Sequence, residues 1–233
     1  MRYLIVTLLG LAAGVAAGGT ALYYNPLTQG GTPPSAAENL VLEYGFPLAD
    51  SMILTHGGTR ALPTVPTDVN ELWEGAIKKI MLNAVTLRGP DGSGRALATR
   101  VSVPSAQTNL LLTGAPVADY WLVTVPGEGS FFVHVRNNLW PFVKDVVIPI
   151  QYLGRTWQGP VQYDPTVGPR ADQAGAVFGA TGRYAETRGT ARMSYRLDSF
   201  SRARGVEAAL GRLHLDLAQL KPRGEELSQA ELE

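Results

Sequence analysis

The sequence predicts a mainly β fold of antiparallel strands with one short helix, preceded by an N-terminal transmembrane or signal helix. Two observations carry this prediction. The chain begins with a long uncharged apolar run, and beyond it short apolar runs alternate with turn-forming glycines and prolines. Its 26 Gly and 16 Pro beside only 17% charged residues favour many turns, which suits short strands better than long helices.

The overall composition excludes several classes of function. The chain has 233 residues, 45% of them hydrophobic, which is enough for one substantial core. Its 20 basic and 20 acidic residues cancel, so no global field attracts nucleic acid or an acidic substrate. Cysteine is absent, which rules out disulfides and thiolate metal sites. Because His56, His134 and His214 stand alone, without metal-ligand spacing, we expect no metal and no cofactor.

Residues 3–24 (YLIVTLLGLAAGVAAGGTALYY) carry the clearest signal. They are uncharged, and at about 1.5 Å per residue they can cross a hydrocarbon core of roughly 30 Å. An uncleaved anchor in a bacterial cytoplasmic membrane would use the whole run and, with Arg2 as the flanking cation, would place the N-terminus in the cytoplasm. Cleavage after Val15-Ala16-Ala17, which would release the chain into the periplasm, is the alternative. We expect the anchor.

Three glycines within this run, Gly10, Gly14 and Gly18, recur every four residues. They therefore lie on one helix face, where small residues let two membrane helices approach closely. Self-association or docking to a partner helix is one interpretation. An ordinary Ala/Gly-rich export signal is the other.

The chain is predicted to divide into four segments. Residues 1–24 are the anchor or signal, and residues 25–37 (NPLTQGGTPPSAA) are a Pro/Gly-rich tether that can sustain neither a helix nor a central strand. Residues 38–220 form the folded β domain, and residues 221–233 are a charged, disordered tail. The folded part is therefore expected on the periplasmic side, held near the membrane and not in it.

Short apolar runs fill the first half of the folded part. We expect strands in AENLVLEYG (37–45) and DSMILTHGG (50–58), then a helix over about 69–81 that begins with a capping-box spacing. Two hairpins follow. NAVTLRG and RALATRVSVP flank the turn GPDGSG, and YWLVTV and SFFVHVR flank PGEG.

The second half continues the pattern. VVIPIQYL (146–153) and GPVQYD (159–164) are expected strands. GRLHLDL (211–217) alternates as a strand does, although Val206, Leu210, Leu213, Leu217 and Leu220 would also make a helical stripe. We favour the strand.

Residues 175–197 (GAVFGATGRYAETRGTARMSYRL) allow two interpretations. Gly179 to Ala185 has the G-x-x-G-x-x-A spacing of a dinucleotide-binding loop, which requires a helix directly after it. The following residues instead alternate with a period of two, and too little chain remains for a doubly wound domain. We therefore expect a hairpin, with Gly179 and Gly182 supplying turn geometry before a strand that begins near Arg188.

The same stretch resembles the late hairpin of the allene oxide cyclase and dirigent barrels, which has the pattern G-G-T-G-x-F-x-x-A-x-G-x-A. Gly179, Thr181, Gly182, Tyr184, Arg188, Gly189 and Ala191 fit it, while Ala180 and Thr187 depart conservatively. The resemblance implies an antiparallel β-barrel of about eight strands. It covers about 20 residues, and the catalytic residues of neither family can be placed on this chain.

Several side chains are candidates for a ligand site in such a barrel. His134 shares a strand face with Arg136, and that face either lines a pocket or meets solvent. Tyr152, Arg155, Trp157 and Tyr163 form an aromatic and cationic cluster. At a barrel mouth this cluster could bind an apolar ligand with one polar end, or it could simply close the barrel.

Two classes of function remain open. In the first, a membrane-tethered extracytoplasmic barrel binds an apolar small molecule, such as a lipid or terpenoid derivative, and isomerises or cyclises it. In the second, the chain is a non-enzymatic accessory or structural subunit of a membrane protein assembly. The expected partners are the cytoplasmic membrane, an apolar ligand, and a membrane protein or second copy reached through the anchor. Nucleic acid is not expected.

Overall fold

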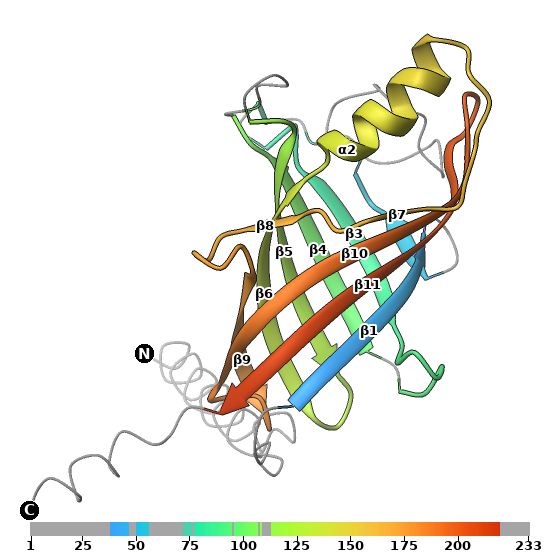
Figure 1. Ribbon diagram of the computed structural model, residues 1–233. Helices are drawn as coiled ribbons and strands as arrows, with labels where there is room; N and C mark the ends of the chain where they lie inside the picture. Colours follow the sequence, from blue (N-terminus) through green and yellow to red (C-terminus); the bar gives the residue numbers. More distant parts are fainter. Residues whose placement is uncertain are drawn as a thin grey trace, which may run out of the picture.

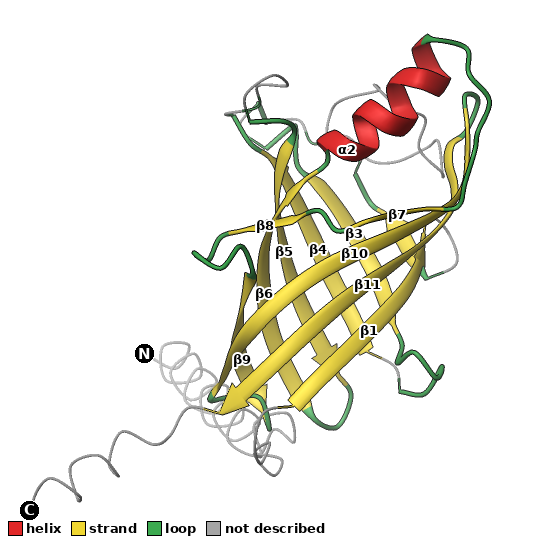
Figure 2. Ribbon diagram, in the orientation of Figure 1, coloured by secondary structure: helices red, strands yellow, loops and turns green. Residues whose placement is uncertain are grey.

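The computed structural model describes residues 38–46, 50–55, 72, 74–75, 77–94, 96–106, 108 and 113–219. These residues form an eleven-stranded antiparallel sheet with one helical segment (Figures 1 and 2). In chain order the elements are β1 Glu38–Phe46, β2 Ser51–Ile53, β3 Met81–Leu87, β4 Ala96–Pro104, β5 Pro116–Val125, β6 Gly129–Asn138, α2 Trp140–Phe142, η1 Val143–Tyr152, β7 Val161–Tyr163, β8 Thr166–Gly168, β9 Gly175–Gly182, β10 Thr187–Ser201 and β11 Gly205–Gln219.

The sheet curls into a nearly closed barrel. Its strand order is β1-β11-β10-β9-β6-β5-β4-β3-β2, with β7 paired to β10 and β8 paired to β6. The two ends of the sheet meet where Glu43, in β1, and Arg88, directly after β3, exchange backbone hydrogen bonds of 2.7 and 2.9 Å. Asp50 reinforces this seam by an ion pair of 2.5 Å with Arg88. The curled sheet thus encloses an interior lined by alternate residues of each strand.

Strict alternation of buried and exposed residues sets the direction of each side chain. In β6, Phe131, Val133 and Val135 are buried, whereas Phe132 and Arg136 are exposed. Because successive strand residues point to opposite faces, the buried set lines the interior and the exposed set forms the outer wall. The interior cluster also includes Leu42, Tyr44, Val85, Leu87, Trp121, Val123, Val177, Tyr184, Leu213, Leu215 and Leu217.

A second, smaller core lies where α2 and η1 follow β6, at one end of the barrel (Figure 1). Val146, Val147 and Ile150 of η1 are buried there against Leu197 and Phe200 of β10. The long β10–β11 hairpin therefore extends beyond the barrel interior and carries the helical segment on its side.

The expected strand over 146–153 is wrong, because these residues belong to η1. A short apolar run does not distinguish a strand from a buried helix. Val146, Val147 and Ile150 have helical spacing and bury one face against the β10–β11 hairpin. Pro149 lies inside this segment, which has the wide turns of a π-helix.

Two further expectations are corrected. Of the expected helix over 69–81, residues 69–71, 73 and 76 lie outside the described residues. Residues 77–79 lie in a turn, with hydrogen bonds from the N–H of Ile77 to the oxygen of Glu74 and from the N–H of Ile80 to the oxygen of Ile77, and β3 begins at Met81. The barrel has nine strands along its main path, and β7 and β8 beside it, in place of about eight. Three-residue strands such as β2 and β8 carry too little alternation to be counted from sequence.

The other strand predictions are confirmed within a few residues at the ends, except that the expected strand over 50–58 appears only as β2, Ser51–Ile53, and residues 56–58 lie outside the described residues. Residues 211–217 lie in β11 and not in a helix, and the stretch 175–197 forms the β9–β10 hairpin. The dinucleotide-loop interpretation is thereby excluded, because β10 stands where a helix would have to begin.

The predicted anchor, tether and tail lie outside the described residues, as do Gly10, Gly14, Gly18 and His56. Among the helices in the described part of the chain, none has the length and apolarity to cross a membrane.

Candidate functional site

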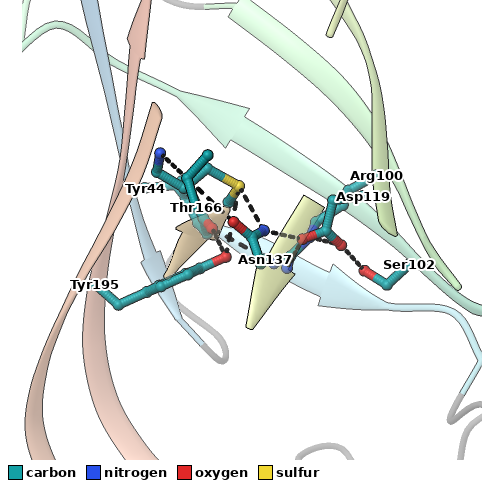
Figure 3. A network of polar contacts seen from close by, with 8 residues as sticks. Tyr44, Arg100, Ser102, Asp119, Asn137, Thr166 and Tyr195 are labelled. Atoms are coloured by element: carbon teal, nitrogen blue, oxygen red, sulfur yellow. Dashed lines mark hydrogen bonds and ion pairs between the residues drawn. The ribbon is translucent and has the colours of Figure 1, made fainter. Parts of the chain in front are cut away.

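A layer of polar side chains crosses the barrel interior near the end that carries α2. Arg100 and Ser102 lie late in β4, Asp119 lies early in the antiparallel β5, and Asn137 lies late in β6. All four are buried. Figure 3 shows them converging with Tyr44 of β1 and with Thr166 and Tyr195 from β8 and β10. The interior toward the opposite end is lined mainly by apolar side chains, so this layer differs from it in being polar.

Asp119 is the centre of the layer. Its carboxylate accepts hydrogen bonds from Arg100 Nε at 3.1 Å and Arg100 Nη2 at 2.9 Å, from Asn137 Nδ2 at 2.6 Å, and from the Ser102 hydroxyl. Four donors occupy the acceptor positions that a carboxylate offers. These four contacts therefore fix the carboxylate in place, and through it they orient Arg100.

Asn137 links this ion pair to the far wall. Its side-chain oxygen accepts a hydrogen bond from the Thr166 hydroxyl at 3.2 Å, and Thr166 in turn accepts one from the backbone N–H of Met193 at 2.8 Å. Asn137 Nδ2 also lies 3.2 Å from Met193 Sδ. The network therefore joins β5, β6, β8 and β10, and it fixes the amide orientation of Asn137.

Arg100 reaches across the barrel toward two tyrosines. Its Nη1 lies 3.5 Å from the hydroxyl oxygen of Tyr44, and the Tyr44 hydroxyl donates to Tyr195 at 3.3 Å. The guanidinium carbon lies 5.1 Å from the centre of the Trp121 ring and 5.9 Å from that of Tyr195. Side chains from opposite walls therefore meet at this level, and aromatic faces surround the cation.

Burial shifts the acidity of these groups. It raises the pKa of Tyr44 and raises that of Tyr195 well above the usual value, so both hydroxyls stay protonated and can donate. Burial, the largest single effect, lowers the pKa of Arg100, but the charge and hydrogen bonds of Asp119 together with Tyr195 and Tyr44 raise it well above the usual value. The site therefore keeps a permanent cation and neutral phenols.

Two buried polar atoms in the same layer have no hydrogen-bond partner among the described residues: the indole N–H of Trp121 and the side-chain oxygen of Asn83. The strand register places both beside Arg100, since Asn83 pairs with Arg100 across β3–β4, and Arg100 pairs with Trp121 across β4–β5. Burying such groups unpaired costs about 1–3 kcal/mol each. These two atoms therefore keep an unmet capacity for hydrogen bonding beside Arg100.

The polar layer presents hydrogen-bond donors, but among the described residues it presents no free general base. The Trp121 N–H is unpaired, and the Tyr195 hydroxyl has as its acceptor only the sulfur of Met193, at 3.9 Å. Asp119 is fully occupied, and the two described histidines lie on outward positions of β6 and β11. The layer can hold an oxygen atom and stabilise negative charge that develops on it.

The structure places His134 and Arg136 on the outer wall, where neither faces the interior. His134 stacks on Tyr120, with ring centres 4.5 Å apart and 15° between the planes. Burial, followed by the nearby charge of Arg136, lowers the pKa of His134. This strand face thus meets the surroundings of the barrel, which was one of the two alternatives left open by the sequence.

The aromatic and cationic cluster is separated by the structure. Tyr152 and Arg155 are exposed, Tyr152 to 68%. Trp157 and Tyr163 pack instead around the small core under η1, where the Trp157 N–H donates to the backbone oxygen of Asp198 at 3.2 Å. The Tyr163 hydroxyl is buried without a partner among the described residues. Ligand binding by these four residues stays a prediction.

The three hairpin glycines occupy crowded positions. Gly182 has a φ of 63°, which favours glycine, and a Cβ there would collide with the backbone oxygen of Glu128. A Cβ on Gly179 would collide with the backbone oxygen of Tyr184, and one on Gly189 with that of Asp216. Close approach of neighbouring backbones thus accounts for Gly179 and Gly189.

Sequence reasoning missed the polar layer. Its residues are scattered, Tyr44 and Tyr195 being 151 positions apart, so no local motif marks them. The available signal was alternation: Arg100 follows Ala96 and Ala98 on one face of ALATRVSVP, and a charge within such a series marks a special site if that face is buried.

Comparison with known proteins gives a distant likeness only. No family model matches the sequence, and no curated protein does. Among solved structures, a nonspecific heme-binding cyclase that catalyses a [4 + 2] cycloaddition during neoabyssomicin biosynthesis is 13% identical, with a TM-score of 0.40 over 84% of this chain and 73% of that one. The Diels-Alderase AbmU from Streptomyces koyangensis is 13% identical, with a TM-score of 0.37 over 83% and 71%. Membership of the allene oxide cyclase or dirigent families is not shown.

Proposed function

We propose that the barrel binds a small apolar molecule bearing an oxygen group and isomerises or cyclises it. The observation that carries the proposal is the Arg100–Asp119 ion pair inside the barrel, ringed by Tyr44, Tyr195 and the unpaired indole N–H of Trp121. The ligand's oxygen would accept hydrogen bonds from these donors. Its apolar part would lie against the apolar side chains that line the barrel toward the opposite end.

The energetic cost of the polar layer supports a role in binding. A buried ion pair is weak evidence for stability, because apolar residues of similar volume would often serve the fold as well. Leaving the Trp121 N–H and the Asn83 oxygen unpaired adds to the cost. Groups with perturbed pKa values in one interior layer are typical of functional sites, and here the pKa is raised for Tyr44 and raised well above the usual value for Arg100 and Tyr195.

The donors also suit a rearrangement within one molecule. In an isomerisation or cyclisation the substrate's own bonds are exchanged, so no co-reactant is needed. Donors fixed around a carbonyl or hydroxyl oxygen lower the barrier when negative charge develops there, and confinement holds the chain of the substrate in a reactive shape. Neither effect requires Asp119 to act as a base.

A matched pair of tryptophan substitutions tests the binding site. Trp121→Phe removes the unpaired N–H inside the barrel, whereas Trp157→Phe removes an N–H that already donates to Asp198 outside it. Calorimetric titration should use farnesol and farnesene, which share a carbon skeleton but differ in the oxygen. We expect the parent chain and Trp157→Phe to bind farnesol more tightly than farnesene, and Trp121→Phe to lose most of that preference.

Two results would count against the proposal. Equal affinity for the alcohol and the hydrocarbon would mean that the polar layer does not recognise oxygen. Loss of farnesol binding in Trp157→Phe alone would move the site to the small core under η1. A separate readout, mass spectrometry of molecules that co-purify with the chain, would show whether oxygenated apolar compounds are retained.

A further inference from the structure

The outer wall of the barrel is unusually free of charge over five neighbouring strands. The outward positions of β3, β4, β5, β6 and β9 include Leu82, Ala84, Thr86, Leu97, Thr99, Val101, Val103, Ala118, Tyr120, Leu122, Thr124, Ser130, Phe132, His134, Arg136, Ala176, Phe178 and Thr181. We call this surface the apolar wall. Within this set no residue is Asp, Glu or Lys, and Arg136, near the end of β6, is its one permanent charge.

The exposed aromatic and aliphatic side chains of the apolar wall are neighbours. Leu122 pairs with Phe132 across β5–β6, and Phe132 pairs with Phe178 across β6–β9. Their exposed fractions are 39%, 49% and 43%. Tyr120, exposed and stacked on His134, lies in the adjacent row. The side chains therefore form one continuous band and not scattered surface residues.

The opposite wall has a different character. The outward positions of β10, β11 and β1 include Arg192, Arg196, Arg212, Asp216 and Glu43. Several are paired there, as in the 2.6 Å contact between Arg212 and Glu43. A solvated barrel would be expected to look like this on all sides, whereas a large continuous apolar patch on a protein surface usually marks an interface.

We propose that a second copy of this chain packs on the apolar wall. Aromatic residues and Met enriched over Lys, Asp and Glu are typical of the centre of a protein–protein interface. In a twofold contact the same patch meets itself, so a patch with several like charges would repel its copy. The apolar wall itself has only Arg136, and Arg188 of the neighbouring β10 lies 5.7 Å from the Phe178 ring centre at the other edge, so the middle of the patch carries no like charge that would oppose self-association.

The size of the apolar wall also suits contact with a second copy of the chain. Five strands spaced about 4.8 Å, each contributing about seven residues at roughly 3.3 Å, make a face of roughly 24 by 23 Å. Such a face covers about 550 Å², roughly two thirds of the area that each partner buries in a standard interface, which suits a small interface. Two such faces can pack as aligned sheets, about 10 Å apart, with Phe132 near the twofold axis.

A lipid surface fits less well. Thr86, Thr99 and Thr124 bring hydroxyl groups into the wall, and His134 brings an imidazole. These groups would lack partners in hydrocarbon, whereas the polar atoms of a second copy can satisfy them. The wall also carries one cation, where an anionic membrane would favour several.

Two leucines provide the test and its matched control. Leu122 is 39% exposed on the apolar wall, and Leu153 is 62% exposed directly after η1. The molar mass of the full chain in a non-ionic detergent should be measured by light scattering over a range of protein concentrations. We expect a dimer for the parent and for Leu153→Arg, and at least about tenfold weaker association for Leu122→Arg, the loss expected from burying an unpaired charge at an interface. Circular dichroism verifies that each variant is folded.

A second measurement works even if Leu122→Arg does not fold. The natural chain has no cysteine, so Phe132→Cys introduces a single thiol on the wall, and Leu153→Cys introduces one away from it. Mild oxidation should link two copies through position 132 and leave the position 153 variant unlinked.

Several outcomes would overturn the proposal. One is a dimer that survives Leu122→Arg but dissociates in Gly14→Leu, because the N-terminal segment would then hold the copies together. Another is a parent chain that stays monomeric and binds phosphatidylcholine vesicles in a manner lost in Leu122→Arg, which would make the wall a lipid surface. A third is equal oxidation of both cysteine variants.

Discussion

Arg100 and Asp119 form a bidentate ion pair inside the barrel, although they do not face each other across the β4–β5 ladder. Asp119 is opposite Ser102, and Arg100 is opposite Trp121, so the guanidinium approaches the carboxylate diagonally. This geometry leaves Ser102 free to donate to the same carboxylate and leaves the aromatic face of Trp121 against the cation. One carboxylate thereby fixes the positions of Arg100, Ser102 and Asn137.

Removing that carboxylate should be costly. In Asp119→Ala the Arg100 charge stays buried without its partner, and we expect the free energy of unfolding to fall by about 3–5 kcal/mol. Asp198→Ala is the control, since its pair with Arg196 is largely exposed and such pairs are worth about 0–1 kcal/mol. Guanidinium titration measures both variants. Similar losses in the two would mean that the interior pair is not desolvated as the structure indicates.

Alkaline pH should destabilise the fold through its tyrosines. Burial, with a hydrogen bond to Glu128, raises the pKa of Tyr184 to about 12, and burial raises the pKa of Tyr44 and Tyr195 above 10.0. Unfolded tyrosines ionise near 10.0, so above that pH the unfolded state loses protons that the folded state keeps. Stability is therefore complete below pH 10.0 and declines as the pH rises through the folded-state pKa values.

Tyrosinate absorbance tests this directly, because the chain has nine tyrosines. Some should ionise late in the folded protein and all should ionise together in denaturant. Tyr44→Phe should reduce the late fraction. A folded-state titration that coincides with the denatured one would contradict the assigned burial.

The alternation of apolar residues at every second position predicted most of the barrel strands correctly. In SFFVHVR and YWLVTV the residues of one face are apolar and repeat every two positions, so both strands appear in the structure. The failure at 146–153 has a physical cause as well. An eight-residue apolar run suits a strand or a buried helix equally, and the contact of Val146 and Ile150 with Leu197 decided between them.

The candidate site could not be found from the sequence for a related reason. In β4 the outward positions are Leu97, Thr99, Val101 and Val103, and the inward ones are Ala96, Ala98, Arg100 and Ser102. Apolarity alone therefore assigns the wrong face to the interior. In β4 the more apolar face points outward because the outer wall of this barrel is apolar and its interior has a polar layer. Only the pairing of the strands in the structure shows which face is which.

The N-terminal apolar run lies outside the described residues, and its role as a membrane anchor stays a prediction. Residues 3–24 are uncharged and apolar, so the chain should sediment with membranes and resist a salt wash, since apolar burial and not charge would retain it. Membrane fractionation followed by N-terminal sequencing measures this. Recovery of a soluble form that begins at Gly18 would establish cleavage of a signal peptide instead.

Two glycines separate the cost of backbone strain from the cost of crowding. Gly127 and Gly182 both have positive φ, 79° and 63°. A Cβ on Gly127 would meet nothing within 4 Å, whereas one on Gly182 would collide with the backbone oxygen of Glu128. That oxygen accepts a hydrogen bond from the N–H of Arg183 at 2.9 Å, so it cannot move away without breaking this bond between the β5–β6 and β9–β10 turns.

We expect thermal unfolding to show a loss of about 1 kcal/mol of stability for Gly127→Ala, the cost of the left-handed conformation alone. Gly182→Ala should lose roughly 2–3 kcal/mol, because displacement of Glu128 is added. Equal losses would mean that the two turns are not in contact at Gly182.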